Sequence, residues 1–158
     1  MPRPFDSRIV DTVISAAMRL TTGRSIKRSF EKTVATWDRK PRFEIETKVS
    51  EKNITLFVYP AGEHAKLYGL VSTGSPPHQI MPRRSGGKLQ FQTGYVAKTS
   101  PGNIGSGPGR TFGAFVSPPV VHHPGFEGRE FGEAIAQKHK AEFEKDMQDA
   151  MNEAAGKM

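Results

Sequence analysis

Two adjacent histidines, His122 and His123, are the residues of this sequence whose type and position most suggest chemistry. They stand in the stretch VVHHPGFEGREFGEAI, residues 120–135, among glycines and acidic residues. Imidazole nitrogens bind Zn²⁺, but successive side chains of an extended segment point to opposite sides, so the pair could share one ion only with difficulty. His139 could join them only if the following helix folded back. The ligand spacing of zinc hydrolases is absent, and we expect no metal site.

Nucleophilic catalysis and phosphate binding also lack their usual sequence contexts. No Gly-x-Ser-x-Gly elbow occurs in the chain. The glycine-rich stretch GNIGSGPG, residues 102–109, superficially resembles a phosphate-binding loop, but no Gly-Lys-Ser/Thr follows it. The chain contains no cysteine, which excludes disulfides and thiolate ligands. The sequence therefore predicts neither catalysis nor a cofactor.

The histidine-containing stretch is better interpreted as a joint between two elements. Pro124-Gly125 is typical of a turn, Phe126 can pack on a core, and a helix then begins at residue 128 or 129. Glu130 and Glu133 would lie in the first turn of that helix, where negative charge interacts favourably with the helix dipole. We predict a structural connection here.

Length and composition fit one domain with a modest core. The chain has 158 residues, of which 35% are hydrophobic. We therefore expect a large part of the chain to lie outside the core, exposed or covered by partners. No apolar run approaches the roughly 18 residues that span a bilayer. Charged residues interrupt the apolar N-terminal stretch, unlike in a secretory signal. We expect synthesis in the cytoplasm and no membrane association.

The charge of the chain is basic and uneven. The formal net charge is +7, yet residues 129–158 contain seven acidic and five basic residues. A basic surface can meet nucleic acid or an acidic protein, and copies of one chain could pair a basic face with the acidic closing segment. No helix-turn-helix or base-stacking motif accompanies the basic residues, so sequence-specific DNA binding is not predicted.

Apolar periodicity predicts three helices. Asp6 is a good N-cap for the first, which runs to about residue 20. The second begins at Ser25 and is closed by Pro41, because the residue before a proline resists helical backbone. The third closes the chain and has apolar residues at every fourth position. These residues are Phe131, Ile135, His139, Phe143, Met147 and Met151.

Alternating apolar and polar residues predict a hairpin of strands 43–49 and 54–59, with shorter strands around 89–91 and 112–116. The expected fold class is α+β: an antiparallel β-sheet packed by two N-terminal helices and a long C-terminal helix, with two long Gly/Pro-rich loops. We expect a single domain, residues 1–158. Its helical N-terminal part covers 1–40, its sheet and loops 42–118, and its C-terminal helix 128–155.

Two loops, residues 73–88 and 98–113, are the predicted assembly surfaces. Their glycines and prolines leave too little apolar surface for them to order alone, so we expect them to take shape against a neighbour. Arg83 and Arg84 can pair with carboxylates on that neighbour. The candidate interface residues are Thr73, Gly74, His78, Arg83, Arg84, Lys88, Ile104, Arg110 and Phe112.

Three segments in this order resemble a known protein family. SFEKTVATWDRKPRFEIET contains Trp37 and Lys40-Pro41-x-Phe43, and LYGLVSTGSPPHQIMPRRSGGKLQF contains His78-x-Ile80-x-Pro82. VVHHPGFEGREFGEAIAQKHKAEFEKDM contains His-Pro-Gly ahead of Arg129-x-Phe131. From Ser29 to Met147, they span about three quarters of the chain. The chain resembles virion-morphogenesis proteins of tailed bacteriophages, of the tail-completion or neck type.

The resemblance implies a structural virion protein and not an enzyme. Such proteins assemble, commonly as a six-fold ring, where the finished tail tube meets the connector of the DNA-filled head. The implied partners are other copies of the chain, the head-connector proteins and the tail-tube or tail-terminator proteins. Viral DNA would pass through the channel without sequence-specific binding. One departure is Val71-Ser72-Thr73-Gly74, where the family usually has a Glu-Gly-Thr-like turn, which leaves the partner of this loop open.

Other functions remain as alternatives to the tail-completion ring. The chain could form a neighbouring ring of the same neck, as a tail terminator or a head–tail adaptor. From a different class, it could be a basic DNA-binding module. Binding to duplex DNA that weakens steeply with salt would favour this alternative. An enzyme has the least support, and mutation of His122 and His123 without effect on function would exclude it.

Overall fold

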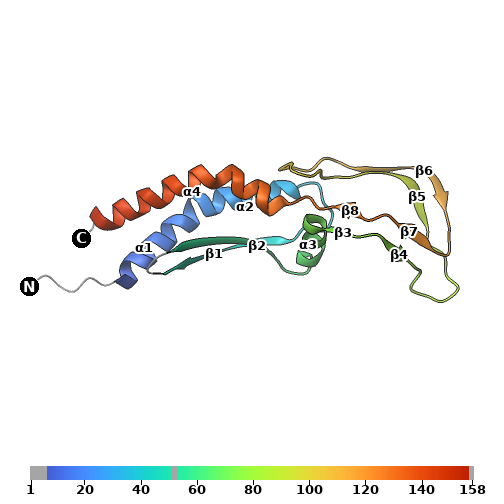
Figure 1. Cartoon of the computed structure of the whole chain (residues 1–158), viewed down its shortest axis with the longest axis horizontal. Helices are drawn as coiled ribbons and strands as arrows, with labels where there is room; N and C mark the ends of the chain where they lie inside the picture. Colours follow the sequence, from blue (N-terminus) through green and yellow to red (C-terminus); the bar gives the residue numbers. More distant parts are fainter. Residues whose placement is uncertain (1–6, 51–52, 157–158) are drawn as a thin grey trace, which may run out of the picture.

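The computed structural model describes residues 7–50 and 53–156 and is elongated. Helices and one long hairpin occupy one end, and short paired strands occupy the other (Figure 1). We call the described residues before Gly74, together with residues 129–156, the body, and residues 74–128 the arm. The fold class is α+β, as predicted.

Three helices of the body correspond to the predicted ones. α1 spans Ser7–Leu20, α2 spans Thr22–Thr33, and α4 spans Phe131–Gly156. The predicted N-cap Asp6 lies outside the described residues. α2 begins and ends earlier than predicted, because after Thr33 the backbone tightens into turns with hydrogen bonds to the third residue before. Within the described part of the chain, no helix is long and apolar enough to cross a membrane.

The closing helix α4 begins at Phe131, later than the predicted residue 128 or 129. Glu130 has a left-handed backbone with φ of 50°, so it precedes the helix instead of lying in its first turn, whereas Glu133 lies there as predicted. The backbone of Gly128 lies against that of Ser72, since a Cβ placed on Gly128 would come 2.6 Å from the Ser72 carbonyl oxygen. This close approach of two backbones requires glycine.

The predicted long hairpin is present, with β1 at Arg42–Val49 and β2 at Ile54–Ala61. Its antiparallel register runs from Arg42 opposite Ala61 to Val49 opposite Ile54. The predicted turn falls partly on residues 51–52, which lie outside the described residues. Phe43 and Val58 face the helices and join the core.

A short helix, α3 at Ala65–Thr73, was not predicted. The sequence indicated only an isolated apolar piece at residues 67–71. Nine residues with a glycine at position 69 give little periodic signal. The helix forms because Tyr68 is buried in the core, and it ends at Gly74, whose φ of 84° favours glycine.

The core of the body consists of two hydrophobic clusters. The larger one joins α2, β1, α3 and α4 through an aromatic group, in which Tyr68 contacts the rings of Phe30, Phe43 and Phe131 at centroid distances of 5.2–6.1 Å. The smaller one joins α1 to the second half of α4 through Met18, Ala150 and their neighbours. The small alanines let the two helices approach closely.

The arm contains three short two-stranded ribbons instead of an extension of one sheet. β3 (Gly74–Ser75) pairs with β8 (Phe126–Glu127), β4 (His78–Ile80) pairs with β7 (Val121–His123), and β5 (Phe91–Val96) pairs with β6 (Arg110–Val116). All pairs are antiparallel, and the β1–β2 hairpin is a fourth separate sheet. The predicted single sheet is thus wrong in connectivity. Prolines at 76–77, 82 and 118–119 interrupt the strands, because proline donates no ladder hydrogen bond.

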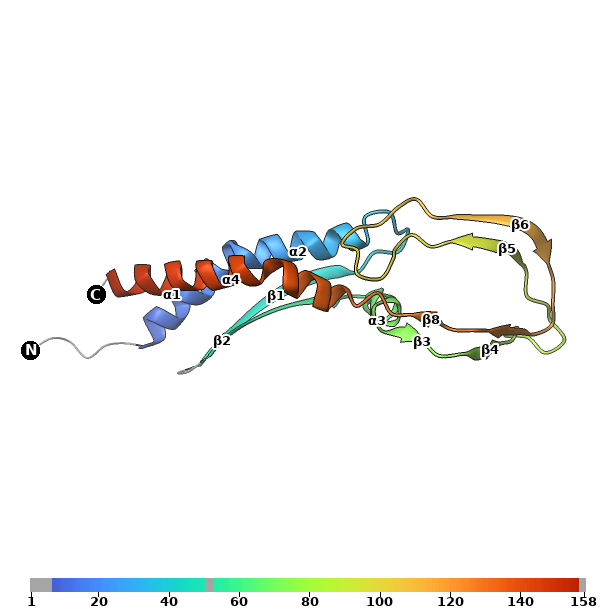
Figure 2. The ribbon, with the colours of Figure 1, turned by 45° about the horizontal axis from the view of Figure 1, so that its top comes forward.

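The arm leaves the body along β3 and β4 and returns along β7 and β8 (Figure 2). Between them, the β5–β6 hairpin runs from the far end back towards the body. At the far end, the Leu89 N–H donates to the Pro118 carbonyl at 2.9 Å and ties the two parts together.

Candidate functional site

The arm has almost no interior of its own. Among residues 74–128, all of which the structure describes, only Thr99 is buried. Large apolar side chains of the arm are exposed instead. They are Ile80, Met81, Phe91, Tyr95, Val96, Phe112, Phe115 and Val120. An exposed apolar surface of this extent on paired strands marks an interaction site.

The β5–β6 hairpin exposes aromatic side chains on both faces. Gln92 lies opposite Phe115 and Gly94 opposite Phe112, which places both phenylalanines on one face. Phe91 and Tyr95 alternate with these positions and lie on the other face. Phe115 is 78% exposed and Tyr95 is 68% exposed. Neither face of the hairpin is therefore covered.

A cation–π contact joins Arg110 and Phe112, two of the predicted interface residues. The Arg110 guanidinium lies 5.5 Å from the centroid of the Phe112 ring, a cation–π contact. The ring lies over Gly94, where a Cβ would come within 2.5 Å of it, and the strand register shifts at this point. The pair presents one cation and one aromatic ring on the same face.

The first predicted loop, residues 73–88, divides between the junction and the far end of the arm. Thr73 ends α3 and donates its hydroxyl to Gly69 O at 3.0 Å, and Gly74 passes against Phe126 and Gly128. These two residues therefore serve the junction with the body. Arg83, Arg84 and Lys88 lie between β4 and β5, exposed or half-exposed, and have no ion-pair partner within the described residues.

The second predicted loop is docked on the body over residues 98–109. The Lys98 ammonium donates to Thr36 O at 2.8 Å and pairs with Asp38 at 3.2 Å. Ser106 accepts from the Thr36 N–H at 3.1 Å, and Ile104 packs on the larger core cluster. The last part of the predicted loop, residues 110–113, belongs to β6.

His78, another predicted interface residue, meets one of the two adjacent histidines. His78 lies opposite His123 in the β4–β7 pair, and their rings stack at a centroid distance of 5.1 Å. His123 Nδ1 accepts the Gly125 N–H at 3.0 Å, while His122 is exposed and lies opposite Gln79. Within residues 7–50 and 53–156, no three His, Asp or Glu side chains are grouped to hold a metal ion.

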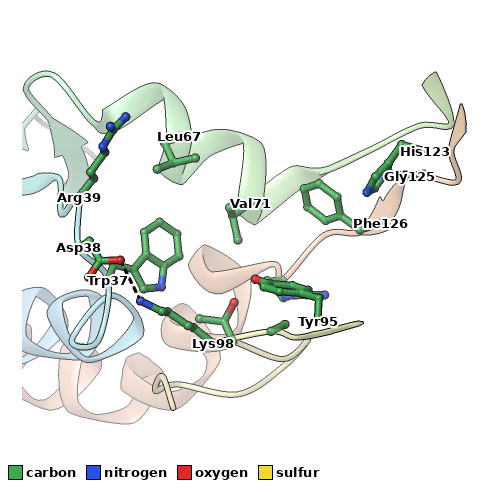
Figure 3. Close-up of a pocket in the computed structure, with 13 residues that line it drawn as sticks. Trp37, Asp38, Arg39, Leu67, Val71, Tyr95, Lys98, His123, Gly125 and Phe126 are labelled. Carbon is green, nitrogen blue, oxygen red and sulfur yellow. Dashed lines mark hydrogen bonds and ion pairs between the residues drawn. The ribbon is translucent and has the colours of Figure 1, made fainter. Parts of the chain in front are cut away.

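A cleft of about 720 Å³ lies at the junction of body and arm (Figure 3). Leu67 and Val71 point into it from α3, and Trp37 lies beneath them. Tyr95, Phe126 and Arg129 belong to the same lining. The Arg129 guanidinium lies 6.0 Å from the Phe126 ring centroid, and its buried Nε has no hydrogen-bond partner within the described residues. The cleft thus combines an apolar lining with cationic side chains.

A series of hydrogen bonds in the body, from buried Ser29 and His139 to exposed Glu142, has the order of a catalytic triad. Ser29 on α2 lies 2.8 Å from His139 Nε2, and His139 Nδ1 lies 2.6 Å from Glu142 Oε2 on α4. In the neutral imidazole, Nδ1–H donates to the carboxylate and Nε2 accepts the serine hydroxyl proton. Ser29 and His139 are 110 positions apart, and no local pattern in the sequence indicates their contact.

The surroundings of these hydrogen bonds favour a structural role. Ser29 and His139 are buried between α2 and α4, and only the imidazole borders a cleft on that side. Ser29 lies inside α2, where backbone N–H groups bond within the helix and are not free to stabilise an oxyanion. The Ser29–His139 hydrogen bond therefore links α2 to α4 through two buried polar side chains that satisfy each other.

Comparison with known proteins gives no match: no family model, no curated protein and no solved structure is similar to the chain. The likeness to phage neck proteins therefore rests on the three segments of sequence.

Proposed function

We propose that the chain is a structural subunit of a tailed-bacteriophage neck, of the tail-completion type. It assembles with copies of itself into a ring, which the resemblance implies to be six-fold, between the tail tube and the head connector. Viral DNA passes through the ring, and the protein acts in the virion by fitting its neighbours and not by catalysis. A tail terminator or head–tail adaptor ring is the neighbouring alternative.

The arm is the observation that carries this proposal. A two-stranded ribbon is marginally stable alone, and this arm has one buried residue between positions 74 and 128. Burying one exposed aromatic side chain of the arm in an interface contributes ~1.5–3 kcal/mol. Several such side chains on both hairpin faces offer enough stabilisation to fix the arm against neighbours. An arm of this kind is expected of a protein that completes its fold on assembly.

The sequence segments that resemble neck proteins also form coherent parts of the structure. Trp37 and Phe43 of the first segment, and Tyr68 of the second, belong to the larger core cluster. Gly125 of the third segment begins the return of the chain to the body, and Phe131 is fully buried in the same cluster. These residues of the three segments thus lie in the core and at the junction from which the arm projects, whereas His78 and Ile80 of the second segment lie in β4 of the arm.

The basic far end of the arm favours a second candidate, a DNA-binding module. Arg83, Arg84 and Lys88 are free of ion pairs within the described residues and could contact phosphates. The aromatic faces of β5–β6 are not needed for such a function. Strong binding to duplex DNA by the isolated chain, weakened steeply by salt, would favour this candidate.

Particles assembled without the protein test the proposed function. We expect filled heads and finished tails that fail to join, seen by electron microscopy, and a loss of infectivity that the wild-type protein restores. Joined and infectious virions assembled in its absence would contradict the proposal.

A further inference from the structure

The two ends of the elongated molecule carry opposite charge. Residues 141–156, the second half of α4, contain five acidic residues and one lysine. The arm, residues 74–128, contains five lysines and arginines and one glutamate. The free end of α4 lies at the opposite end of the molecule from the arm (Figure 1). One copy cannot bring these two surfaces together, but two copies can.

The outer face of the second half of α4 is a continuous exposed stripe. Glu144, Gln148, Met151 and Ala155 follow one another at spacings of four, three and four residues, and all are exposed. Met151 is 47% exposed and gives the stripe an apolar centre. Glu144 has no ion-pair partner within the described residues. The stripe therefore offers an apolar side chain, Met151, and the carboxylate of Glu144.

The junction cleft offers the complementary chemistry. Leu67, which is 41% exposed, and the Trp37 ring provide apolar surface at the cleft. Arg39 is exposed beside them and has no ion-pair partner within the described part of the chain. The buried Nε of Arg129 lacks an acceptor within the described residues, and Lys98 also lines the cleft. The only carboxylate in the lining, Asp38, already pairs with Lys98.

We infer that the junction cleft of one copy binds the acidic outer stripe of α4, around Glu144 to Met151, of a second copy. This inference deepens the proposed ring-forming function and rests on it. Met151 fills the apolar part of the cleft, and the carboxylate of Glu144 meets the exposed guanidinium of Arg39. A volume of about 720 Å³ accommodates several side chains of a helix face.

The placement of the two surfaces determines the kind of assembly. Because cleft and stripe are different surfaces of one chain, the contact is heterologous, and each copy keeps one free cleft and one free stripe. Repetition of such a contact gives a ring when the rotation closes. The β5–β6 hairpin borders the cleft through Tyr95 and remains available to a neighbour of another kind.

A charge-swap experiment tests the contact. The helix variant carries Glu144→Lys with Gln148→Lys, and the cleft variant carries Arg39→Glu with Leu67→Glu. All four positions are exposed, so folding is expected to persist, which circular dichroism checks. Each variant alone should self-associate at least ~10-fold more weakly than wild type in analytical ultracentrifugation, because its two surfaces then carry like charge. An equimolar mixture should regain association, since each cleft then meets a complementary stripe.

Covalent capture provides a second measurement. The chain has no cysteine, so Leu67→Cys with Met151→Cys introduces the only thiols. A bis-maleimide linker should give a ladder of trimers and larger species, whereas each single-cysteine variant stops at dimers. The control pair Leu67→Cys with Leu20→Cys, with Leu20 exposed on α1, should give no ladder.

Three results would overturn the inference and leave the neck function to be judged by the particle experiment. The first is wild-type self-association that neither variant weakens. The second is a wild-type chain that stays monomeric and gives no ladder at any concentration tested. The third is a monomeric chain whose duplex-DNA binding is lost in the cleft variant, which would assign the cleft to nucleic acid.

Discussion

The Thr22 hydroxyl donates a 2.6 Å hydrogen bond to Asp146 Oδ2, linking the first residue of α2 to the second half of α4 across 124 positions of sequence. Thr21, the residue preceding the helix, makes no side-chain cap bond of its own. Asp146 therefore supplies negative charge and an acceptor at the N-terminus of α2 from another helix.

Replacing this carboxylate should destabilise the body. We expect Asp146→Ala to lower the free energy of unfolding by ~0.5–2 kcal/mol, as loss of a helix cap does. Urea denaturation followed by circular dichroism measures the change. Asp149→Ala, on the same helix and exposed, is the matched control and should stay within about 0.5 kcal/mol of wild type. Equal effects of the two substitutions would contradict the capping role.

The contact between Thr22 and Asp146 predicts that the stability of the protein depends on pH. Hydrogen bonding from Thr22 lowers the pKa of Asp146 below its ordinary value, outweighing the opposite effect of partial burial. A carboxyl whose pKa is depressed by folding stabilises the protein above its unfolded pKa, and this contribution is lost as the pH falls through the folded pKa. We expect the stability difference between wild type and Asp146→Asn to shrink below about pH 4. A difference in stability between the two proteins that stays constant from pH 7 to pH 3 would argue against the hydrogen-bonded role of the Asp146 carboxylate.

The Ser29–His139 contact should act on stability and not on catalysis. Ser29→Ala leaves a buried imidazole nitrogen without its partner, which costs ~1–3 kcal/mol. The neighbouring Ser25→Ala, on the same helix and half-buried, should have a smaller effect. Any slow hydrolysis of an activated ester should be unchanged by Ser29→Ala. Hydrolysis that depends on Ser29 would instead show that the buried Ser29–His139 pair belongs to an active site.

Replacing Gly128 or Gly132 by alanine should change the stability of the protein in opposite directions. Gly128→Ala places a Cβ 2.6 Å from Ser72 O and should destabilise the junction by ~1–3 kcal/mol or prevent folding. Gly132→Ala, in the first turn of α4, meets no atom within 4 Å and should stabilise the protein by up to ~1 kcal/mol. Thermal unfolding of both variants makes the comparison. Two destabilising substitutions of equal size would contradict the close packing of α3 on the joint.

The sequence predicts those parts of the fold that have local signals. α1, α2 and α4 show apolar periodicity, and β1–β2 shows alternation over two eight-residue strands. The pairing of Gly74 with Glu127 joins two-residue strands more than fifty positions apart, for which no local pattern exists. The predicted Arg110 and Phe112 lie on the exposed hairpin. The junction cleft was not predicted, because its lining combines residues 37–39 after α2, side chains of α3 and both edges of the arm.

Hydrogen exchange of the isolated chain, compared with the chain in the proposed assembly, tests most directly the claim that the arm depends on neighbours. In the isolated chain we expect amides of β5 and β6 to exchange with little protection while those of α2 and α4 are slow, because the hairpin has no covering layer. In assembled particles the same hairpin amides should become strongly protected. Equal protection of hairpin and helices in the isolated monomer, unchanged on assembly, would contradict the account.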